Sequence, residues 1–348
     1  MNKRSIISEI KNLPDKKILV VQTAFLGDVI LITPLIRAIR IKFPDAIIDV
    51  LVLKENKEVL QNNPNINSIF TFDKKNRKLI SLLQNIFLFR KIKYDVVFTP
   101  HSSITTGLMI FLSAIKYRIG FERWFAQIFL NVKVKHLANT LKIKKNLNLI
   151  SFFDGKEYSI QTELFPSFEM IEKAKRIVTE LRKNSKKVIA IAPGSVWKTK
   201  MWPKENYRSL VSRLVERNYG IIIIGSKNER DLADEIMSEK KTINLAGEMS
   251  VLESAAVIQL CDLMICNDSG AMHIANAMMT DVFAFFGPTT KNIGYAPFRE
   301  NDFVFEVDID CRPCSSHGSD NCPLGHFYCM KNITVEQVLQ KIEQKFGS

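Results

Sequence analysis

The segment NDSGAMHIAN, residues 267–276, places a carboxylate, a hydroxyl and a glycine directly after an apolar run. Asp, Ser and Gly suit the cap or tight turn that begins a helix. The backbone N–H groups at such a helix start attract anions. The segment therefore predicts a site for a phosphorylated ligand, and a plain helix cap is the alternative interpretation of the same residues.

A second group of candidate phosphate ligands follows a β-rich run near the middle of the chain. Gly194 lets the backbone approach a ligand closely, and Ser195 adds a hydroxyl. Lys198 and Lys200 supply the cations that a pyrophosphate needs in the absence of a metal. We expect the loop to clamp a phosphate, with its two tryptophans supporting it by packing.

Two carboxylates follow other β-rich runs. Asp28 comes after the first run, and ligands of parallel sheets bind beyond the carboxyl ends of strands, so Asp28 could act as a general base. Complementing a helix dipole is the alternative role. Glu229 could accept hydrogen bonds from ribose hydroxyls or simply begin a helix. A classical NAD site is disfavoured because the Asp28 segment holds a single glycine where Gly-x-Gly-x-x-Gly is required.

The elements that position these residues alternate between strand and helix. Short β-rich runs separated by amphipathic helical segments predict an α/β fold with parallel sheets covered on both faces. The runs are 17–21, 47–53, 95–99, 188–192, 220–224, 263–266 and 282–286. A charged segment, 172–187, predicts a helix leading to an inter-domain joint.

The length of 348 residues favours two domains. Thr334 and Gln337 form a capping-box pattern before apolar residues at helical spacing, which predicts a closing helix. The expected divisions are a Rossmann-like domain at 1–170, a linker helix region at 171–187, a second Rossmann-like domain at 188–330 and a C-terminal helix at 331–348.

Composition bounds the function classes. With 46% hydrophobic and 24% charged residues, and no apolar run near the roughly 20 residues of a membrane span, we expect a soluble cytoplasmic protein. The formal charge is +13, and residues 74–93 hold seven Lys or Arg and no acid. Nucleic acid, an anionic membrane surface, a phosphorylated acceptor or no partner at all could explain this basic excess.

Four of the six cysteines cluster near the end of the chain with two histidines. They are Cys311, Cys314, Cys322 and Cys329. Three interpretations stay open: a structural metal such as zinc, packed reduced thiols, or redox-linked pairing.

Five segments, in this order and at these separations, resemble glycosyltransferase family 9, the ADP-heptose:lipopolysaccharide heptosyltransferases. They are FLGDVILITPLIRAIR, APGSVWKTKMWP, LAGEMSVLESAAVI, NDSGAMHIANAM and FGPTT. The Asn-Asp-Ser-Gly-x-Met-His form and the cysteine-containing tail are most similar to the heptosyltransferase II branch. The resemblance implies a GT-B fold, in which two doubly wound Rossmann-like domains face each other across a cleft and the last helix packs back toward the first domain.

The resemblance also implies residue roles. Asp28 matches the catalytic base, Lys200 the lysine that holds the donor phosphates, and Asp268 the carboxylate that contacts the transferred heptose. Further matches to donor-side positions are Ser195, Glu229, Met249, Ser269, Gly270, Ala271 and His273, and Lys198 is a donor-side candidate from its loop alone. Apart from the resemblance, the residues themselves suggest acceptor-side candidates, which are His101, Ser102, Lys116, Arg118 and His136. A surface or internally bonded histidine is the alternative for both histidines.

The implied activity is inverting transfer of L-glycero-D-manno-heptose from ADP-heptose to the lipopolysaccharide inner core, as its second heptose, with no cofactor required for catalysis. The implied partners are ADP-heptose, a lipid-anchored core acceptor and the cytoplasmic face of the inner membrane as a peripheral contact. One alternative is a related GT-B transferase or epimerase that uses another nucleotide sugar. A nucleic-acid-binding protein is disfavoured because the basic runs lack interleaved aromatics in a recognised module.

Overall fold

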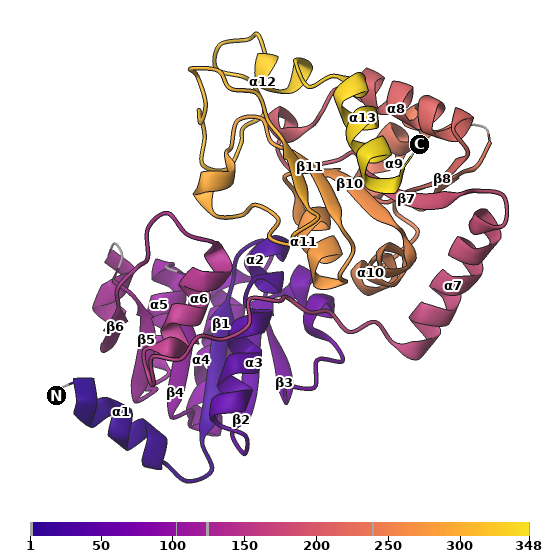
Figure 1. Cartoon of the computed structure of the whole chain (residues 1–348). Coiled ribbons are helices and arrows are strands. Elements are labelled where there is room, and N and C mark those ends of the chain that lie inside the picture. Colours follow the sequence, from indigo (N-terminus) through magenta and orange to yellow (C-terminus); the bar gives the residue numbers. More distant parts are fainter. Residues whose placement is uncertain (1–2, 102, 123–124, 239, 348) are drawn as a thin grey trace. The chain divides into compact units, whose positions relative to one another are not determined.

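The structure is a computed structural model that describes residues 3–347 apart from 102, 123–124 and 239. The chain divides into two compact units, Met1–Phe165 and Pro166–Ser348. Each unit is built on its own parallel sheet (Figure 1). The α/β class predicted from the alternating runs is confirmed.

The sheet of the first unit has, within the described residues, six parallel strands in the order β3-β2-β1-β4-β5-β6. The strands are β1 (Lys17–Gln22), β2 (Ile47–Leu53), β3 (Ser68–Phe72), β4 (Val96–Thr99), β5 (Tyr117–Phe121) and β6 (Val132–Val134). Ile18 to Val21 in β1 are fully buried, as expected for a central strand covered on both faces. The strand order reverses between β1 and β4, which is where ligands bind in such sheets.

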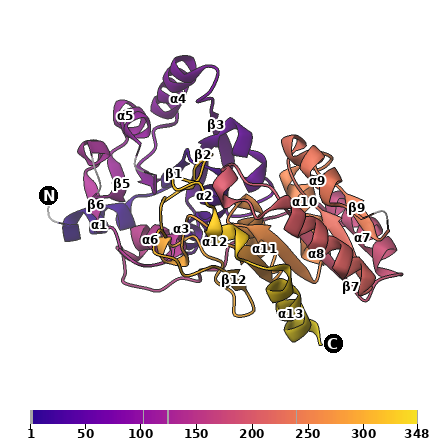
Figure 2. The same ribbon diagram turned by 90° about the horizontal axis from the view of Figure 1, so that it is seen from above.

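Helices cover both faces of this first sheet. They are α1 (Lys3–Asn12), α2 (Leu26–Ile30), α3 (Thr33–Lys42), α4 (Lys78–Ile92), α5 (Ile104–Leu112) and α6 (Lys142–Ser151), with short 3-10 turns at Lys54–Asn56, Glu58–Leu60 and Phe125–Phe129. Figure 2 shows α4 and α5 on one side of the sheet and α3 and α6 on the other. Phe89 of α4 and Met109 of α5 pack against Leu19 and Val97 of the sheet.

The second unit repeats this winding. Its described sheet has six parallel strands in the order β12-β11-β10-β7-β8-β9, which reverses between β7 and β10. The strands are β7 (Lys187–Ala192), β8 (Tyr219–Ile223), β9 (Thr242–Asn244), β10 (Leu263–Asn267), β11 (Val282–Phe285) and β12 (Phe303–Phe305). Trp202 stacks on Phe285 in the core, with ring centroids 4.4 Å apart.

The helices of the second unit include the two predicted near its ends. They are α7 (Phe168–Arg182), α8 (Lys204–Glu216), α9 (Arg230–Ile236), α10 (Val251–Leu260), α11 (Gly270–Ala277), α12 (Tyr328–Lys331) and α13 (Val335–Phe346), with 3-10 turns at Lys198–Lys200, Lys227–Glu229 and Lys291–Ile293. The helix expected at 172–187 begins earlier, at Phe168, and packs along α10. The Thr334 and Gln337 capping box of α13 is present.

The apolar face of α13 packs within the second unit. Val338, Leu339 and Ile342 join the core around Trp202, and the helix contacts α8. The expectation that this helix also packs toward the first domain stays a prediction. In the part of the chain that the structure describes, no helix combines the length and apolarity needed to cross a membrane.

Candidate functional site

A buried ion pair joins two loops at the carboxyl edge of the second sheet. Lys200 ends the 3-10 turn after β7, and Asp268 directly follows the adjacent strand β10. Lys200 Nζ lies 2.6 Å from Asp268 Oδ2, and their side chains are only 13% and 8% exposed. Thr289, in the loop after β11, donates a second hydrogen bond of 2.7 Å to the same oxygen. The structure thus brings two predicted site residues together where the strand order reverses.

The start of α11 lies immediately beyond this pair. Ser269 is the N-cap residue in extended conformation, and its side chain makes no capping hydrogen bond. The first turn, which begins at Gly270 and Ala271, contains no acidic residue. The predicted helix start after the NDSG segment is therefore confirmed. The first-turn N–H groups and the adjacent ammonium form a polar edge suited to an anion such as a diphosphate.

Asn267, the first residue of the NDSG segment, anchors the Lys200 loop to the sheet, a role that was not predicted. Its buried side-chain amide donates to the carbonyls of Pro193, at 2.7 Å, and Gly194, at 3.2 Å. Its Oδ1 accepts a hydrogen bond of 2.9 Å from the backbone N–H of Trp202. The available signal was a polar side chain ending an otherwise apolar strand, because a buried amide must find partners.

The cysteine-containing tail holds the other side of the Lys200 loop. Thr199 donates through Oγ1 to the Ser319 carbonyl at 2.7 Å, and Ser319 N–H donates back to that hydroxyl at 2.8 Å. Gly318, at φ +94°, packs so tightly that an added Cβ would lie 2.8 Å from Trp197 and 3.1 Å from Lys200. This support was not predicted, because a contact between loops 120 residues apart leaves no periodic pattern in the sequence.

Glu229 has a structural partner as well as a predicted ribose role. Its carboxylate accepts a hydrogen bond from Ser226 N–H at 2.6 Å, completing a capping box. It also lies against Gly194, where an added Cβ would come within 1.8 Å of Glu229 Oε1. The helix-start alternative is thus present, and the ribose role stays a prediction.

The remaining donor-side candidates differ in exposure. Lys198 is exposed, whereas Ser195 and Met249 are partly buried in the loops that follow β7 and precede α10. His273, on α11, is buried and makes an edge contact with Tyr295 at a centroid distance of 6.3 Å. Their roles toward a nucleotide sugar stay predictions.

Asp28 and His101 follow the two central strands of the first sheet, β1 and β4. Asp28 is half-buried in α2, and no side-chain hydrogen bond caps that short helix. The Thr23 hydroxyl lies 3.2 Å from His101 Nδ1 and 2.9 Å from Thr106 Oγ1. Burial lowers the pKa of His101, the Asp28 charge opposes that shift, and Lys142 reinforces it. The structure therefore places a carboxylate and a histidine with a lowered pKa at one switch point.

The other acceptor-side candidates are not gathered there. Lys116 precedes β5 and pairs with Glu9 of α1 at 3.3 Å, so it lies at the amino edge of the sheet, opposite the edge that carries Asp28. Arg118 donates to the carbonyls of Ile115 and Phe129, which occupies its guanidinium within the fold. His136 makes an edge contact with the Phe121 ring. Ser102 lies outside the described residues.

The four clustered cysteines are free thiols, and Cys311, Cys314 and Cys322 lie close enough to Cys329 for their charges to act on it. Burial raises the pKa of Cys329 to about 11, and the charges of Cys314, Cys322 and Cys311 add to the shift. Among the described residues, no group of three or more His, Cys, Asp or Glu side chains is arranged to hold a metal ion. The zinc hypothesis therefore has no geometric support here, and the choice among the three interpretations stays a prediction.

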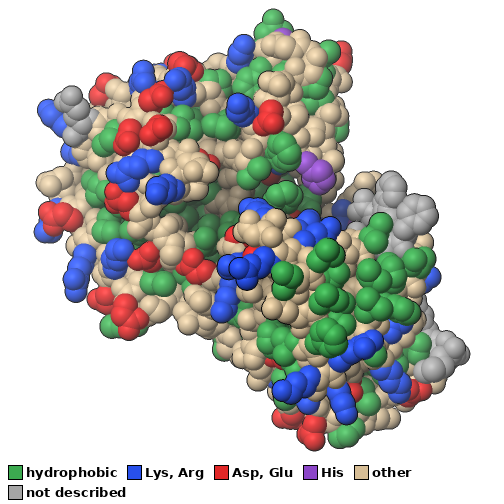
Figure 3. All heavy atoms as spheres, turned by 180° about the vertical axis from the view of Figure 1, so that it is seen from behind, with side chains coloured by type: hydrophobic (Ala, Val, Ile, Leu, Met, Phe, Trp, Pro, Cys, Tyr) green, Lys and Arg blue, Asp and Glu red, His purple; other side chains and the backbone are tan. Residues whose placement is uncertain are grey.

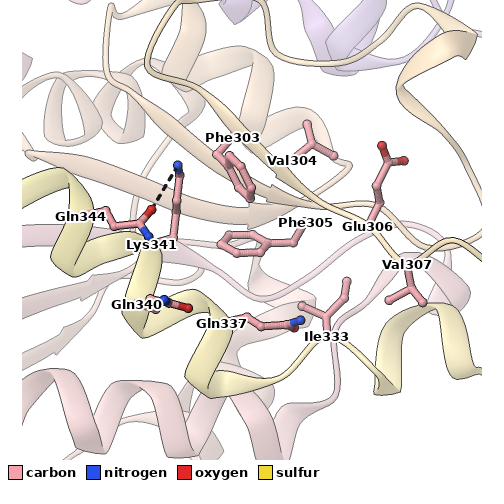
Figure 4. A pocket seen from close by; sticks show the side chains of 10 residues that line it. All are labelled: Phe303, Val304, Phe305, Glu306, Val307, Ile333, Gln337, Gln340, Lys341 and Gln344. Carbon is pink, nitrogen blue, oxygen red and sulfur yellow. Dashed lines mark hydrogen bonds between the residues drawn. The ribbon is translucent and has the colours of Figure 1, made fainter.

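A pocket of about 320 Å³ lies between β12 and α13 (Figure 4). Phe303, Glu306 and Lys341 are among its lining side chains, and the Lys341 ammonium lies 4.4 Å from the Phe303 ring centroid. Its lining includes none of the predicted donor or acceptor residues. The candidate site is therefore formed by the strand-edge residues and not by this pocket.

Known proteins resemble this chain in sequence and in fold. The chain is 26% identical over 334 residues to lipooligosaccharide heptosyltransferase 2 of Campylobacter jejuni, covering 93% of this chain and 97% of that protein. Its fold matches Escherichia coli ADP-heptose lipopolysaccharide heptosyltransferase II, with a TM-score of 0.78 at 20% identity, covering 94% and 98% of the two chains. A family 9 glycosyltransferase of Veillonella parvula matches with a TM-score of 0.83 at 21% identity, covering 96% and 98%. Because the model of glycosyltransferase family 9 (heptosyltransferase) matches residues 87–324, more than half of the chain, the chain belongs to that family.

Proposed function

We propose that this glycosyltransferase moves a heptose from ADP-heptose to the inner core of lipopolysaccharide, with inversion at the anomeric carbon, and that the sugar it adds is the second core heptose. The observation that carries the proposal is the Lys200–Asp268 pair beside the start of α11, at the switch point of the second sheet of a family 9 chain. Relatives that are named heptosyltransferase 2 or II support ADP-heptose as the donor and the second core heptose as the sugar that is added.

On the donor side, negative charge grows on the departing ADP as the glycosidic bond breaks. Lys200 and the first-turn N–H groups of α11 are fixed before the reaction and stabilise that charge. When the diphosphate takes the Lys200 ammonium, the Asp268 carboxylate is released to accept hydrogen bonds from the heptose hydroxyls. Lys200 and the N–H groups of α11, which belong to the chain itself, therefore stabilise the negative charge of the departing ADP.

On the acceptor side, Asp28 takes the proton from the attacking hydroxyl of the core sugar. His101, kept neutral by its lowered pKa and hydrogen-bonded to Thr23, adds no positive charge that would weaken the Asp28 carboxylate as a base. The acceptor carries a lipid anchor, so the proposal includes peripheral contact of the enzyme with the cytoplasmic face of the inner membrane.

The test is incubation with ADP-heptose and two core acceptors, one without heptose and one with a single heptose. The proposal expects one added heptose, seen by mass, on the second acceptor and not on the first. Addition to the heptose-free acceptor would move the chain to the first-heptose step, and failure with both acceptors would refute the function. A thermal-shift screen of other nucleotide sugars tests the alternative that the chain uses a different donor.

A further inference from the structure

The helix α4 is apolar on both of its faces, which is unusual for a helix at a protein surface. Its inner face packs Ile86 and Phe89 into the core. Its outer face presents Ile80, Leu83 and Phe87, which are 54%, 53% and 67% exposed. Because these three residues are three and four positions apart, they lie along one line of the helix. Packing in the core therefore does not account for the exposed apolar residues of α4.

The neighbouring elements extend this exposed line into a face. Phe111 of α5 is 49% exposed, and its ring lies 6.0 Å from that of Phe129 in the 3-10 turn Phe125–Phe129. Arg90 of α4 donates to the Leu112 carbonyl of α5 at 2.7 Å, so the two helices are joined side by side. We call the exposed apolar residues of these elements the α4–α5 face: Leu79, Ile80, Leu83, Phe87, Ile104, Phe111, Leu112 and Ile128. Figure 3 shows hydrophobic side chains gathered over the first unit, with Lys and Arg around them.

Positive charge flanks the α4–α5 face at both ends of α4. Exposed basic residues precede the helix or begin it, and others close it, with no acidic residue anywhere between positions 74 and 93. They are Lys74, Lys75, Arg77, Lys78, Arg90, Lys91 and Lys93. An apolar surface bordered by Lys and Arg is the pattern of elements that lie in the interface of an anionic bilayer.

We propose that the α4–α5 face docks on an anionic phospholipid bilayer, with its apolar side chains in the boundary between headgroups and acyl chains and its basic residues against the lipid phosphates. Charge complementarity favours this occupant. A second copy of the chain in a symmetric dimer would instead bring two basic borders together, and like charges across an interface oppose association. The inference deepens the proposed function, because it assigns the membrane contact of a lipid-acceptor enzyme to a particular surface.

The experiment measures binding of the full chain to vesicles by flotation. Vesicles of phosphatidylcholine alone are compared with vesicles that also contain phosphatidylglycerol, at low and high salt. We expect binding to the anionic vesicles that weakens with salt. The double variant Leu83→Gln/Phe87→Gln should lose about tenfold or more in affinity, and Arg77→Gln/Lys91→Gln about fivefold for each charge removed.

The matched control is Phe168→Gln, since Phe168 begins α7 in the second unit and is 72% exposed, close to the 67% of Phe87. It should bind vesicles as the unaltered chain does, and thermal unfolding checks that every variant is folded. Equal binding of the α4 variants and the control, or no binding to anionic vesicles, would overturn the inference. A double variant that lowers the oligomeric mass by light scattering but keeps vesicle binding would assign the face to self-association and would also overturn it.

Turnover on a lipid-free core oligosaccharide keeps this inference separate from the proposed function. The α4 variants should process that soluble acceptor at the rate of the unaltered chain, because none of them alters a proposed donor or acceptor residue. Vesicle binding without heptose transfer would refute the proposed function and leave the docking face standing. If the chain transfers heptose but the α4 variants bind vesicles as well as the unaltered chain does, the docking inference is refuted and the proposed function stands.

Discussion

Replacing Lys200 by Met should destabilise the second unit because it leaves the Asp268 carboxylate without its buried cation. The paired side chains are 13% and 8% exposed at a distance of 2.6 Å. Removing one partner of a buried pair costs about 3–5 kcal/mol. Thr289 still donates to the carboxylate, so we expect the lower end, about 3 kcal/mol. Met preserves most of the lysine stem that packs near Gly318.

Thermal unfolding measures this effect directly. The second unit spans Pro166–Ser348, a size at which 1 kcal/mol shifts the midpoint by about 2–4 °C, so the expected fall is about 6–12 °C. The double variant Lys200→Met/Asp268→Asn removes the unpaired charge and should recover to within about 1 kcal/mol of the unaltered chain.

An exposed pair of nearly the same geometry provides the control. Lys175 Nζ lies 2.7 Å from Glu172, but these side chains are 53% and 38% exposed. Lys175→Met should therefore change the free energy of unfolding by no more than about 0.5 kcal/mol. If Lys200→Met cost no more than Lys175→Met, or if the double variant showed no recovery, burial would not strengthen the Lys200–Asp268 pair and the reasoning would fail.

Three further predictions concern pH, thiol reactivity and the Gly194 loop. Burial puts the folded pKa of His101 below its unfolded value, so the unfolded chain takes up more protons as pH falls. Between about pH 7.5 and about pH 5.5 the unaltered chain should therefore lose more stability in urea titrations than His101→Gln, and equal losses would contradict this. Although burial opposes it, hydrogen bonds from backbone N–H groups around Phe327 lower the pKa of Cys322, whereas burial raises that of Cys261 to about 12. Iodoacetamide at neutral pH should thus alkylate Cys322 first, as peptide masses would show, and faster labelling of Cys261 would refute the assignment. Gly194→Ala should displace the Glu229 carboxylate and cost about 1 kcal/mol of capping-box stability. Glu229→Ala should cost the same. Because the two positions interact, the double variant should lose less stability than the sum of the two single changes, and a loss equal to that sum would contradict this.

The sequence predicted the central strands of both sheets and missed the peripheral ones. Strands such as β1 and β10 are continuous apolar runs because helices cover both of their faces. The strands β6, β9 and β12 hold three residues each, too few for an apolar run or an alternation to stand out. The β5 run is interrupted by Arg118, whose charge is occupied by backbone carbonyls that only the folded chain supplies.

The candidate site likewise contains residues that could be predicted from the sequence and residues that could not. Asp28, Lys200 and Asp268 could be selected because each follows a central strand, and parallel strands deliver their carboxyl ends to one edge of a sheet. Ser319 could not be selected, because its bonds to Thr199 join two loops whose sequences carry no periodicity. Lys116 and Arg118 were acceptor-side candidates, but the fold turns the first toward Glu9 and the second toward carbonyl groups.

The most direct test of the central claim follows ADP release from ADP-heptose by the unaltered chain and by Asp28→Asn. Asp45→Asn, at an exposed aspartate between α3 and β2, serves as the control. We predict that the unaltered chain and Asp45→Asn release ADP only when the core acceptor is present. Asp28→Asn should bind ADP-heptose with unchanged affinity and lose turnover by a factor of about 100 or more. Full turnover by Asp28→Asn, or no ADP-heptose turnover by the unaltered chain, would contradict the account.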